Sequence, residues 1–317
     1  MHFPTSGVEV FPLIPFIVAF AVSFFTSMGG VSGAFLLLPF QVSVLGFTSP
    51  SVSPTNLVYN IVAIPSGVYR YIKEGRLAWP LAWVIIVGTL PGVFIGAIFR
   101  IKYLPDPKNF KFFVGCVLLY IGTRLLYDLT ERASAKKAKT KELEERFKAR
   151  CSMTRKGLES GVADDAVIRT THFSFTKYSY EFYGDTFSFN PIILFMLTFV
   201  VGIIGGTYGI GGGAIIAPFL IAIFDLPVYT IAGAALLGTF LTSIAGVAFY
   251  TLIAPFYAHT GLSIAPDWML GVLFGAGGFL GMYSGARVQK YMPAKTIKLI
   301  LGLVIVFLSV RYIINIF

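Results

Sequence analysis

Charged residues are scarce in this sequence. They make up 13% of its 317 residues, whereas soluble domains carry about 25%. Because hydrophobic residues reach 56% and the mean hydropathy is +0.78, the composition excludes an ordinary cytosolic enzyme and a disordered chain. Only two cysteines are present, Cys116 in an apolar run and Cys151 in a polar one, which argues against a disulfide framework. The three histidines are scattered and cannot form a metal cluster by themselves.

Signatures of enzymes and of nucleotide-driven pumps are also missing. The sequence has no phosphate-binding Gly-x-x-x-x-Gly-Lys-Ser/Thr loop, no His-Glu-x-x-His and no Gly-x-Ser-x-Gly. Gly211, Gly212 and Gly213 cannot form a dinucleotide loop, because apolar runs rather than a strand–helix unit flank them. We therefore expect neither an enzyme nor a bound cofactor or metal.

Acidic side chains are absent from the interior of the apolar runs. Asp128, Asp225 and Asp267 all lie near the ends of such runs. Proton relays in membranes usually use buried Asp, Glu or His, so nothing indicates a carboxylate-coupled pump. The same absence favours an anionic over a cationic cargo.

Apolar runs long enough to cross a bilayer, which takes about 20 residues, fill most of the chain. They cover 52–72, 79–100, 109–128, 228–252, 268–288 and 296–316. Two longer runs, 12–46 and 191–224, are interrupted near their middle by clustered glycines. A break in a membrane helix is tolerated only where protein or a wet cavity satisfies the freed backbone groups. The expected fold class is an all-α integral membrane protein, and no basic region precedes the first run to indicate a signal peptide.

The two interrupted runs align with each other, which predicts a tandem duplication. Residues 30–40 match residues 209–219, and the same offset of 179 residues continues without a gap to Tyr71 and Tyr250. After a short insertion the alignment pairs Trp79 with Trp268, Gly92 with Gly281, Gly96 with Gly285, Gly115 with Gly302 and Arg124 with Arg311. Broken helices in corresponding positions of two repeats are typical of secondary transporters. We expect a first membrane repeat at 1–128, a polar linker at 129–190 and a second repeat at 191–317.

The charge distribution predicts an orientation. The net charge of +10 comes from basic residues between apolar runs, which indicates orientation in the bilayer rather than nucleic-acid binding. The mainly basic linker is therefore expected in the cytoplasm, as a solvated connection or as a loop that binds a partner, and 253–267, without Lys or Arg, outside. If each broken run enters and leaves the membrane on one side, three full crossings follow it in each repeat. Because three is an odd number, the repeats are then inverted, with both termini outside. If each broken run instead crosses the membrane once, each repeat has four crossings and the repeats are parallel. The favoured arrangement leaves Arg100, Lys102, Lys108 and Lys111 facing outward, against the charge rule.

The broken runs are candidate anion sites. A helix that begins just after Gly33 or Gly212 has unpaired N–H groups and a partial positive charge at its start, which suits an anion. Gly211 and Gly213 allow close approach to the backbone, and Ser32 adds a hydroxyl donor. Close helix crossing also requires small residues, and it is the competing interpretation.

The helix after each break carries further polar side chains. Ser53, Asn56 and Asn60 share one helical face, while Thr239 and Ser243 occupy the comparable helix of the second half. Polar groups inside a membrane run need partners or a polar cavity. We expect Asn56 and Asn60 to line the site; for the hydroxyl side chains, hydrogen bonding between helices is an equal alternative.

Three arginines, Arg70, Arg124 and Arg311, lie toward helix ends. They are expected either to extend into the membrane interface or to form an entry funnel for anions.

The pattern Gly-x-Gly-Gly-Gly-x-Ile-x-x-Pro at 209–218, with its looser copy at 30–39, resembles the TauE/SafE sulfite exporter family, also called the 4-toluene sulfonate uptake permease family. The small residues of 232–250 with Ser243, and Trp79 and Trp268, are similar to that family as well. The resemblance covers both halves, but Ser32 stands where glycine is usual, and the linker is longer than in compact members. It implies a multi-pass transporter of a prokaryotic cell membrane for sulfite, sulfoacetate or related organosulfonates.

Together these observations predict an alternating-access exporter of a small anion. The expected substrate site comprises Ser32, Gly33, Asn56, Asn60, Gly211, Gly212, Gly213, Thr239 and Ser243. An anion channel, a carboxylate transporter of the same family and a membrane scaffold that binds a partner through the linker are the alternatives. The expected partners are the anion and the lipid bilayer, with no nucleic acid. The sequence leaves open a homodimer and a cytoplasmic partner of the linker.

Overall fold

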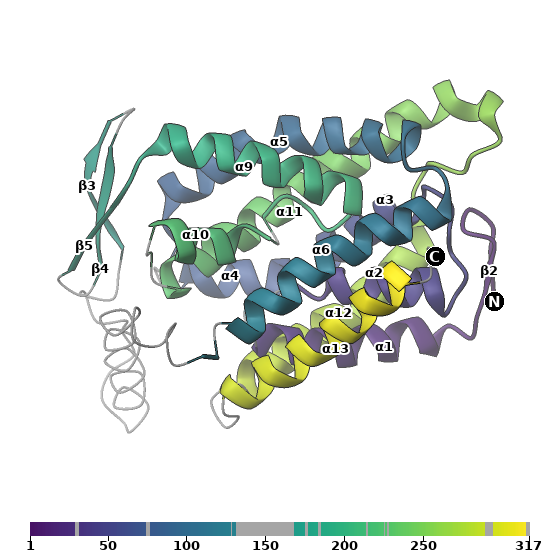
Figure 1. Ribbon diagram of the computed structural model, residues 1–317, viewed down its shortest axis with the longest axis horizontal. Helices are drawn as coiled ribbons and strands as arrows, with labels where there is room; N and C mark the ends of the chain where they lie inside the picture. The colour runs from purple at the N-terminus through teal and green to yellow at the C-terminus, as the bar shows by residue number, and fades with distance from the viewer. Residues whose placement is uncertain are drawn as a thin grey trace.

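The computed structural model is a bundle of helices with a small β-sheet at one end (Figure 1). It describes residues 1–28, 32–73, 77–127, 129–130, 168–174, 177–182, 185–213, 215–224, 226, 228–288 and 294–314. Within these, four helical stretches are long and apolar enough to cross a membrane: 79–102, 107–127, 191–208 and 230–260. The predicted mostly helical membrane protein is therefore confirmed.

The helices follow the predicted apolar runs closely. In the first half they are α1 (Leu13–Met28), α2 (Ala34–Ser43), α3 (Val52–Ala63), α4 (Pro65–Lys73), α5 (Trp79–Lys102) and α6 (Pro107–Tyr127). The second half has α9 (Pro191–Tyr208), α10 (Ile216–Phe224), α11 (Val228–Ile253) with the 3₁₀ helix η2 (Ala254–Thr260), α12 (Trp268–Val288) and α13 (Ala294–Ile314). Both long runs are thus broken at their glycines, as predicted.

One predicted run differs from the structure. Residues 52–72 form two helices, α3 and α4, rather than one. Pro65 is the cause, because it has no N–H for the carbonyl of Ile61 and its ring clashes with the preceding turn. Pro65 instead occupies the first position of α4, where a proline is well tolerated.

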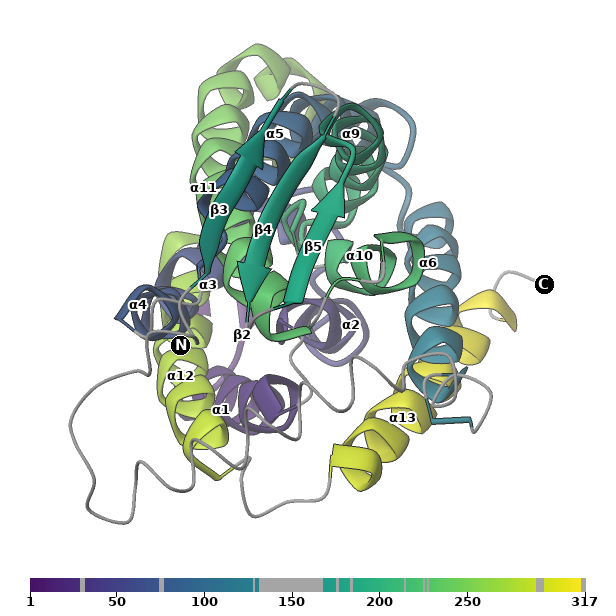
Figure 2. The same ribbon diagram turned by 90° about the vertical axis from the view of Figure 1, so that its left-hand side faces the viewer.

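A three-stranded antiparallel sheet precedes α9 and adds β-structure to the expected all-α fold. Its strands are β3 (Arg169–Phe173), β4 (Tyr178–Phe182) and β5 (Asp185–Phe189), in the order β3-β4-β5. Figure 2 views the bundle from the end that the sheet covers. Tyr180 is buried, and its hydroxyl lies 2.8 Å from Thr230 Oγ1 of α11, which ties the sheet to the helices. Residues 131–167 of the predicted linker lie outside the described residues.

Glycines let α5 pack closely on α9, and α12 on α1. A Cβ at Gly92 would lie 2.4 Å from the Phe199 carbonyl oxygen, and a Cβ at Gly281 would lie 2.3 Å from the Phe20 carbonyl oxygen. Neither position has room for a side chain. Each pair therefore holds its backbones in direct contact, as small residues permit in membrane helices.

Each broken run begins and ends at one end of the bundle, and the two runs use opposite ends. Phe224, at the end of α10, packs on Phe189, just before α9, with ring centroids 6.3 Å apart. In the first half, Ser43 at the end of α2 has its Oγ 2.6 Å from the Tyr312 hydroxyl near the C-terminus. Figure 1 places both chain termini at the end where the first run begins and ends, opposite the sheet.

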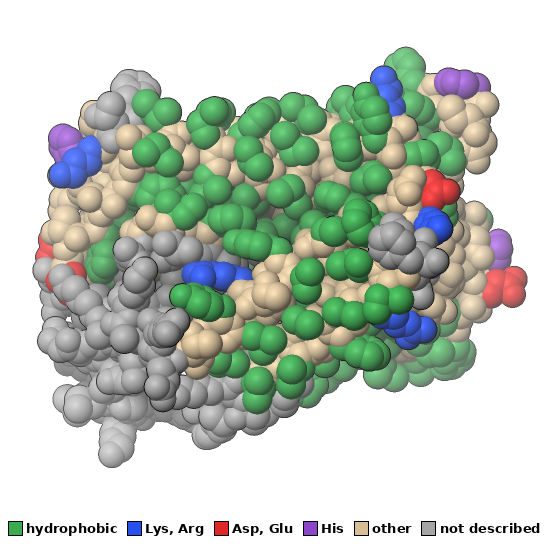
Figure 3. Space-filling view, viewed as in Figure 1, with side chains coloured by type: hydrophobic (Ala, Val, Ile, Leu, Met, Phe, Trp, Pro, Cys, Tyr) green, Lys and Arg blue, Asp and Glu red, His purple; other side chains and the backbone are tan. Residues whose placement is uncertain are grey.

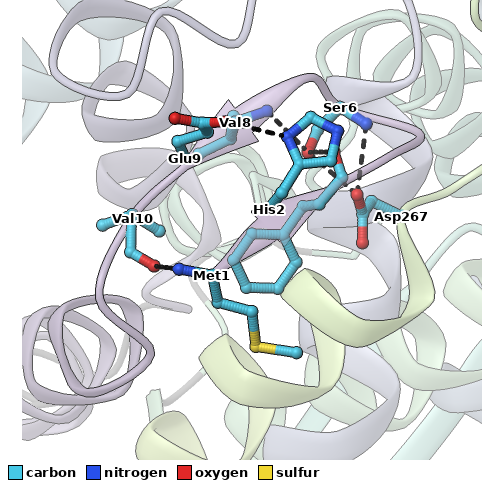
Figure 4. Close-up of polar contacts among 8 residues, drawn as sticks. Met1, His2, Ser6, Val8, Glu9, Val10 and Asp267 are labelled. Carbon is cyan, nitrogen blue, oxygen red and sulfur yellow. Dashed lines mark hydrogen bonds and ion pairs between the residues drawn. The ribbon is translucent and has the colours of Figure 1, made fainter.

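The N-terminal hairpin closes that end of the bundle (Figure 4). Strands β1 (His2–Phe3) and β2 (Val8–Glu9) pair, and the Ser6 hydroxyl between them donates to Asp267 Oδ2 at 2.8 Å. Asp267 Oδ1 accepts from the Leu270 N–H in the first turn of α12, at 3.1 Å. The carboxylate therefore links the hairpin to the start of α12.

Hydrophobic side chains dominate the middle of the face drawn in Figure 3, and most charged side chains lie toward the two ends of the long axis. A membrane normal along this axis leaves the apolar belt in lipid and the termini and the sheet on opposite sides.

Candidate functional site

The first turns of α3 cross between the two helix breaks, and two amide side chains join them. Asn56 Nδ2 donates to the carbonyls of Ala34 and Gly209, both at 2.9 Å. Asn60 Nδ2 donates to the carbonyl of Ile210 at 2.9 Å and to Ser243 Oγ at 3.3 Å. Both amides are completely buried. The two predicted site asparagines therefore bond to backbone carbonyls beside both breaks, and those of Gly209 and Ile210 lie where α9 has ended and offers no helical partner.

The first break is closed by hydroxyl groups. Ser32 Oγ donates to Asn60 Oδ1 at 3.2 Å and accepts from the Ala34 N–H at 3.3 Å, in the first turn of α2. Helix α2 begins directly after Gly33, as predicted. A Cβ at Gly33 would lie 2.6 Å from the Tyr59 hydroxyl, so the position is packed against α3.

The second break is a short non-helical turn rather than an immediate helix start. Gly209 ends α9 with a left-handed φ of 86°, and Gly211 has a φ of 79°. Helix α10 begins only at Ile216, so the expectation that it begins just after Gly212 is wrong. The two positive φ angles explain the delay, because the chain first reverses through left-handed conformations that favour glycine.

Helix α11 covers the second break. The Gly212 N–H donates to Thr242 Oγ1 at 3.3 Å. A Cβ at Gly213 would lie 2.6 Å from Thr239 Oγ1, and one at Gly211 would lie 3.0 Å from Ser243 Oγ. Thr239 and Ser243 thus lie against the glycines, while Thr242 accepts the hydrogen bond from the backbone. These glycines are in close contact with protein in this conformation.

Two further side chains lie at the site, outside the expected substrate set. Gln41 of α2 donates from Nε2 to Asn56 Oδ1 at 3.1 Å, and its buried Oε1 has no partner among the described residues. The signal was present, because Gln41 is the one amide in the apolar run 12–46. The hydroxyl of Tyr208, at the end of α9, donates to the Phe35 carbonyl at 2.8 Å and so joins the two breaks directly.

The three arginines predicted as a funnel do not come together. Helices α6 and α13 run antiparallel, since Gly115 lies against Tyr312 and Gly302 lies against Leu126. Arg124 and Arg311 occupy the last turns of these two helices and so lie at opposite ends of the bundle. The side chain of Arg70 lies outside the described part of the structure.

The site carries no formal charge on its described side chains. Its lining consists of amides, hydroxyls and backbone around the two breaks, all buried: Ser32, Gln41, Ser53, Asn56, Asn60, Thr239, Thr242 and Ser243. Within the described residues no group of three His, Cys, Asp or Glu side chains could hold a metal ion. A ligand at such a lining would meet hydrogen-bond donors and backbone dipoles rather than ion pairs.

A helical membrane bundle in which two broken helices meet at a polar centre is typical of membrane transporters. The chain belongs to the family described as "Sulfite exporter TauE/SafE", whose model matches residues 15–312. It is also 23% identical, over 296 residues, to the "Probable membrane transporter protein YunE" of Bacillus subtilis (strain 168), a match that covers 90% of this chain and 92% of the relative. No solved structure matches the chain significantly.

Proposed function

We propose that the protein is a secondary transporter that moves a small anion, sulfite or an organosulfonate, across the cell membrane by alternating access. The observation that carries the proposal is the meeting of both helix breaks at Asn56 and Asn60. The absence of acidic side chains from this uncharged site suits an anion, and the family description supplies sulfite as the candidate substrate.

The two halves are proposed to be inverted repeats. Supporting contacts recur at equivalent positions: Gly88, Gly92 and Gly96 of α5 lie against the carbonyls of Phe195, Phe199 and Ile203. In the other half, Gly277, Gly281 and Gly285 of α12 lie against the carbonyls of Phe16, Phe20 and Phe24. Each carbonyl residue of the first half is 179 positions before its counterpart, which is the offset of the sequence repeat. The antiparallel course of α6 and α13 also supports inversion.

If the two repeats move apart, hydrogen-bond donors that now join them become available to the substrate. Three of the four donor contacts from Asn56 and Asn60 reach from α3 of the first repeat to the second repeat, at Gly209, Ile210 and Ser243. Separating the repeats frees these N–H groups together, and an oxyanion can accept all of them. The closed arrangement is then restored when the anion leaves, which links substrate release to the conformational change.

The test is sulfite flux into proteoliposomes that hold the purified protein, with empty liposomes as the control. Sulfoacetate, sulfate, thiosulfate and lactate are added as competitors. Saturable sulfite flux that organosulfonates inhibit is the expected result. Current that rises with voltage and does not saturate would indicate a channel, and inhibition by lactate alone would indicate a carboxylate transporter. Absence of flux of every sulfur anion from folded protein would overturn the proposed substrate.

The linker 129–190 is proposed to be cytoplasmic and dispensable for transport. Deleting residues 131–167 removes most of its basic side chains and no described helix. Flux through the shortened protein should remain within about twofold of the full chain if the linker is a solvated connection. Loss of flux with an intact fold would instead support a linker that binds a partner.

A further inference from the structure

The guanidinium of Arg100, in the last turn of α5, is buried without a counter-ion. Its side chain is completely inaccessible to solvent. One nitrogen, Nη1, donates to the Leu104 carbonyl, and the ring of Phe110 covers one guanidinium face, with its centroid 3.7 Å from Cζ. Within the described residues no carboxylate lies within salt-bridge distance of it. Burial of an unpaired cation is unfavourable, so an anion bound beside Arg100 would stabilise it.

The free nitrogens of Arg100 form a specific binding edge. Nε and Nη2 have no hydrogen-bond partner in the part of the chain that the structure describes. These two N–H groups lie side by side along one edge of the guanidinium plane and point in nearly parallel directions, which is the geometry that binds two oxygens of one oxyanion. Phe110 stacks on the guanidinium face and so does not occupy this edge.

A second unpartnered donor lies in the same buried cluster. The hydroxyl of Tyr250 in α11 is buried and has no hydrogen-bond partner among the described residues. It also lies beside the hydroxyl of Ser53, although the two lack hydrogen-bond geometry. Tyr250 belongs to one hydrophobic cluster with Ala97 and Ile101, which lie on either side of Arg100 in α5. The polar groups are therefore enclosed by apolar side chains.

This pair of residues adjoins the central site. Ser53 Oγ is 3.4 Å from the carbonyl oxygens of Thr207 and Tyr208, in the last turn of α9, and a Cβ at Gly209 would lie 2.5 Å from Ser53 Cα. Arg100, Tyr250 and Ser53 therefore follow one another from the end of the bundle that carries the termini toward the second break.

We propose that Arg100 and Tyr250 form a second anion-binding site, outside the central one, for a small oxyanion with two oxygens on one face, such as sulfite, a sulfonate or sulfate. The role of this site on the route of the substrate rests on the proposed function, whereas its binding of an anion does not. Helix α5 places this cation at the end of the bundle opposite the sheet, and an anion that enters there meets Arg100 before it reaches Asn56.

The test uses anion-dependent stabilisation of the purified protein and the KM of flux. Sodium sulfite is titrated against sodium gluconate at constant ionic strength while thermal unfolding is followed. Sulfite should raise the Tm of the wild-type protein. Arg100→Met should weaken the apparent affinity at least about tenfold, since two charge-assisted hydrogen bonds are lost. Its Tm without sulfite should equal or exceed that of the wild type, because the unpaired charge is gone. Tyr250→Phe should weaken the affinity about threefold to tenfold.

Lys102→Gln is the matched control, because it removes an exposed charge from the same end of α5. Tyr257→Phe, in η2 against the same cluster, controls for loss of a phenol hydroxyl. Both should leave the sulfite-dependent shift and the KM within twofold of wild type. If Arg100→Met does not fold, Arg100→Lys and Tyr250→Phe are judged by the same affinity criterion.

The outcomes separate the two proposals. A sulfite-dependent Tm shift whose apparent affinity falls at least about tenfold in Arg100→Met supports this site even if no flux is measured, in which case only the transport function fails. Flux with an unchanged KM and an unchanged Tm shift in Arg100→Met overturns the site and leaves transport standing. A variant that is destabilised equally at all sulfite concentrations also overturns it, because Arg100 would then act only through Leu104 and Phe110.

Discussion

Asn56 Nδ2 donates a hydrogen bond to the carbonyl of Gly209 at 2.9 Å, across 153 positions of the chain. The same nitrogen donates to Ala34, so one side chain satisfies a carbonyl beside each of the two helix breaks. The amide is oriented by these two acceptors, which leaves Oδ1 to accept from Gln41. Asn56 therefore links the positions of the two breaks to each other.

Replacing Asn56 by Leu should abolish flux and lower stability by about 2–4 kcal/mol, because two carbonyls and the Gln41 amide lose a buried partner. Sulfite flux in proteoliposomes and chemical unfolding in detergent measure the two effects. Thr251→Val is the control, since that hydroxyl bonds only to Val247 within its own helix. It should keep full flux and lose less than about 1 kcal/mol. Wild-type flux in Asn56→Leu would remove this residue from the site.

Gly209→Ala should cost more than Gly261→Ala. Both glycines have left-handed φ angles, 86° and 70°, so each alanine costs about 1–2 kcal/mol in backbone strain. At Gly261 nothing lies within 4 Å of the new Cβ, whereas at Gly209 the Cβ would lie 2.5 Å from Ser53 Cα. We expect a further loss of at least about 2 kcal/mol at Gly209, together with loss of flux. Equal unfolding free energies for the two variants would show that the second break has room to move.

The helices, their breaks and the helix ends were largely predictable from the sequence, because apolar length and clustered glycines act locally. The apolar composition of 52–72 predicts one helix, but Pro65 favours the start of a new helix, and the structure has two helices there. The sheet at 169–189 was not predicted, although Tyr178, Tyr180 and Phe182 alternate with polar residues in the period of a strand. The polar composition of this stretch favours a solvated linker, whereas its period of two favours a strand.

The lining of the site was predictable as a set of residues but not as a set of contacts. Asn56 and Asn60 share a helical face, and this local fact placed both correctly beside the breaks. Whether they bond to each other, to substrate or to backbone depends on where α9 ends relative to α3, which is a long-range property. The burial of Arg100 could not be predicted for the same reason, because it depends on Phe110 of the next helix, whose ring covers the guanidinium.

Gly92→Ala and Gly281→Ala should destabilise the protein to a similar extent, because each new Cβ would lie within 2.4 Å of a carbonyl oxygen of the neighbouring helix. Separation of the helices should cost about 1–3 kcal/mol in each variant. Gly67→Ala, in α4, is the control: its Cβ would meet only Leu236 Cδ1 at 3.4 Å, and the higher helix propensity of alanine should stabilise it by up to about 1 kcal/mol. A large loss at one of the two positions only would argue against equivalent packing of the halves.

The inverted arrangement predicts opposite accessibility for equivalent residues. Val44, at the end of α2, and Ile223, at the end of α10, are separated by the repeat offset of 179 and are exposed by 68% and 55%. Each is replaced by cysteine in a protein with Cys116→Ser and Cys151→Ser, and intact cells are treated with a membrane-impermeant maleimide. Val44→Cys should react in intact cells, because it lies at the end that carries the termini, whereas Ile223→Cys should react only after permeabilisation. Reaction of both from the same side would require parallel repeats, and the mechanism in which Asn56 and Asn60 open alternately to the two sides would then have no structural basis.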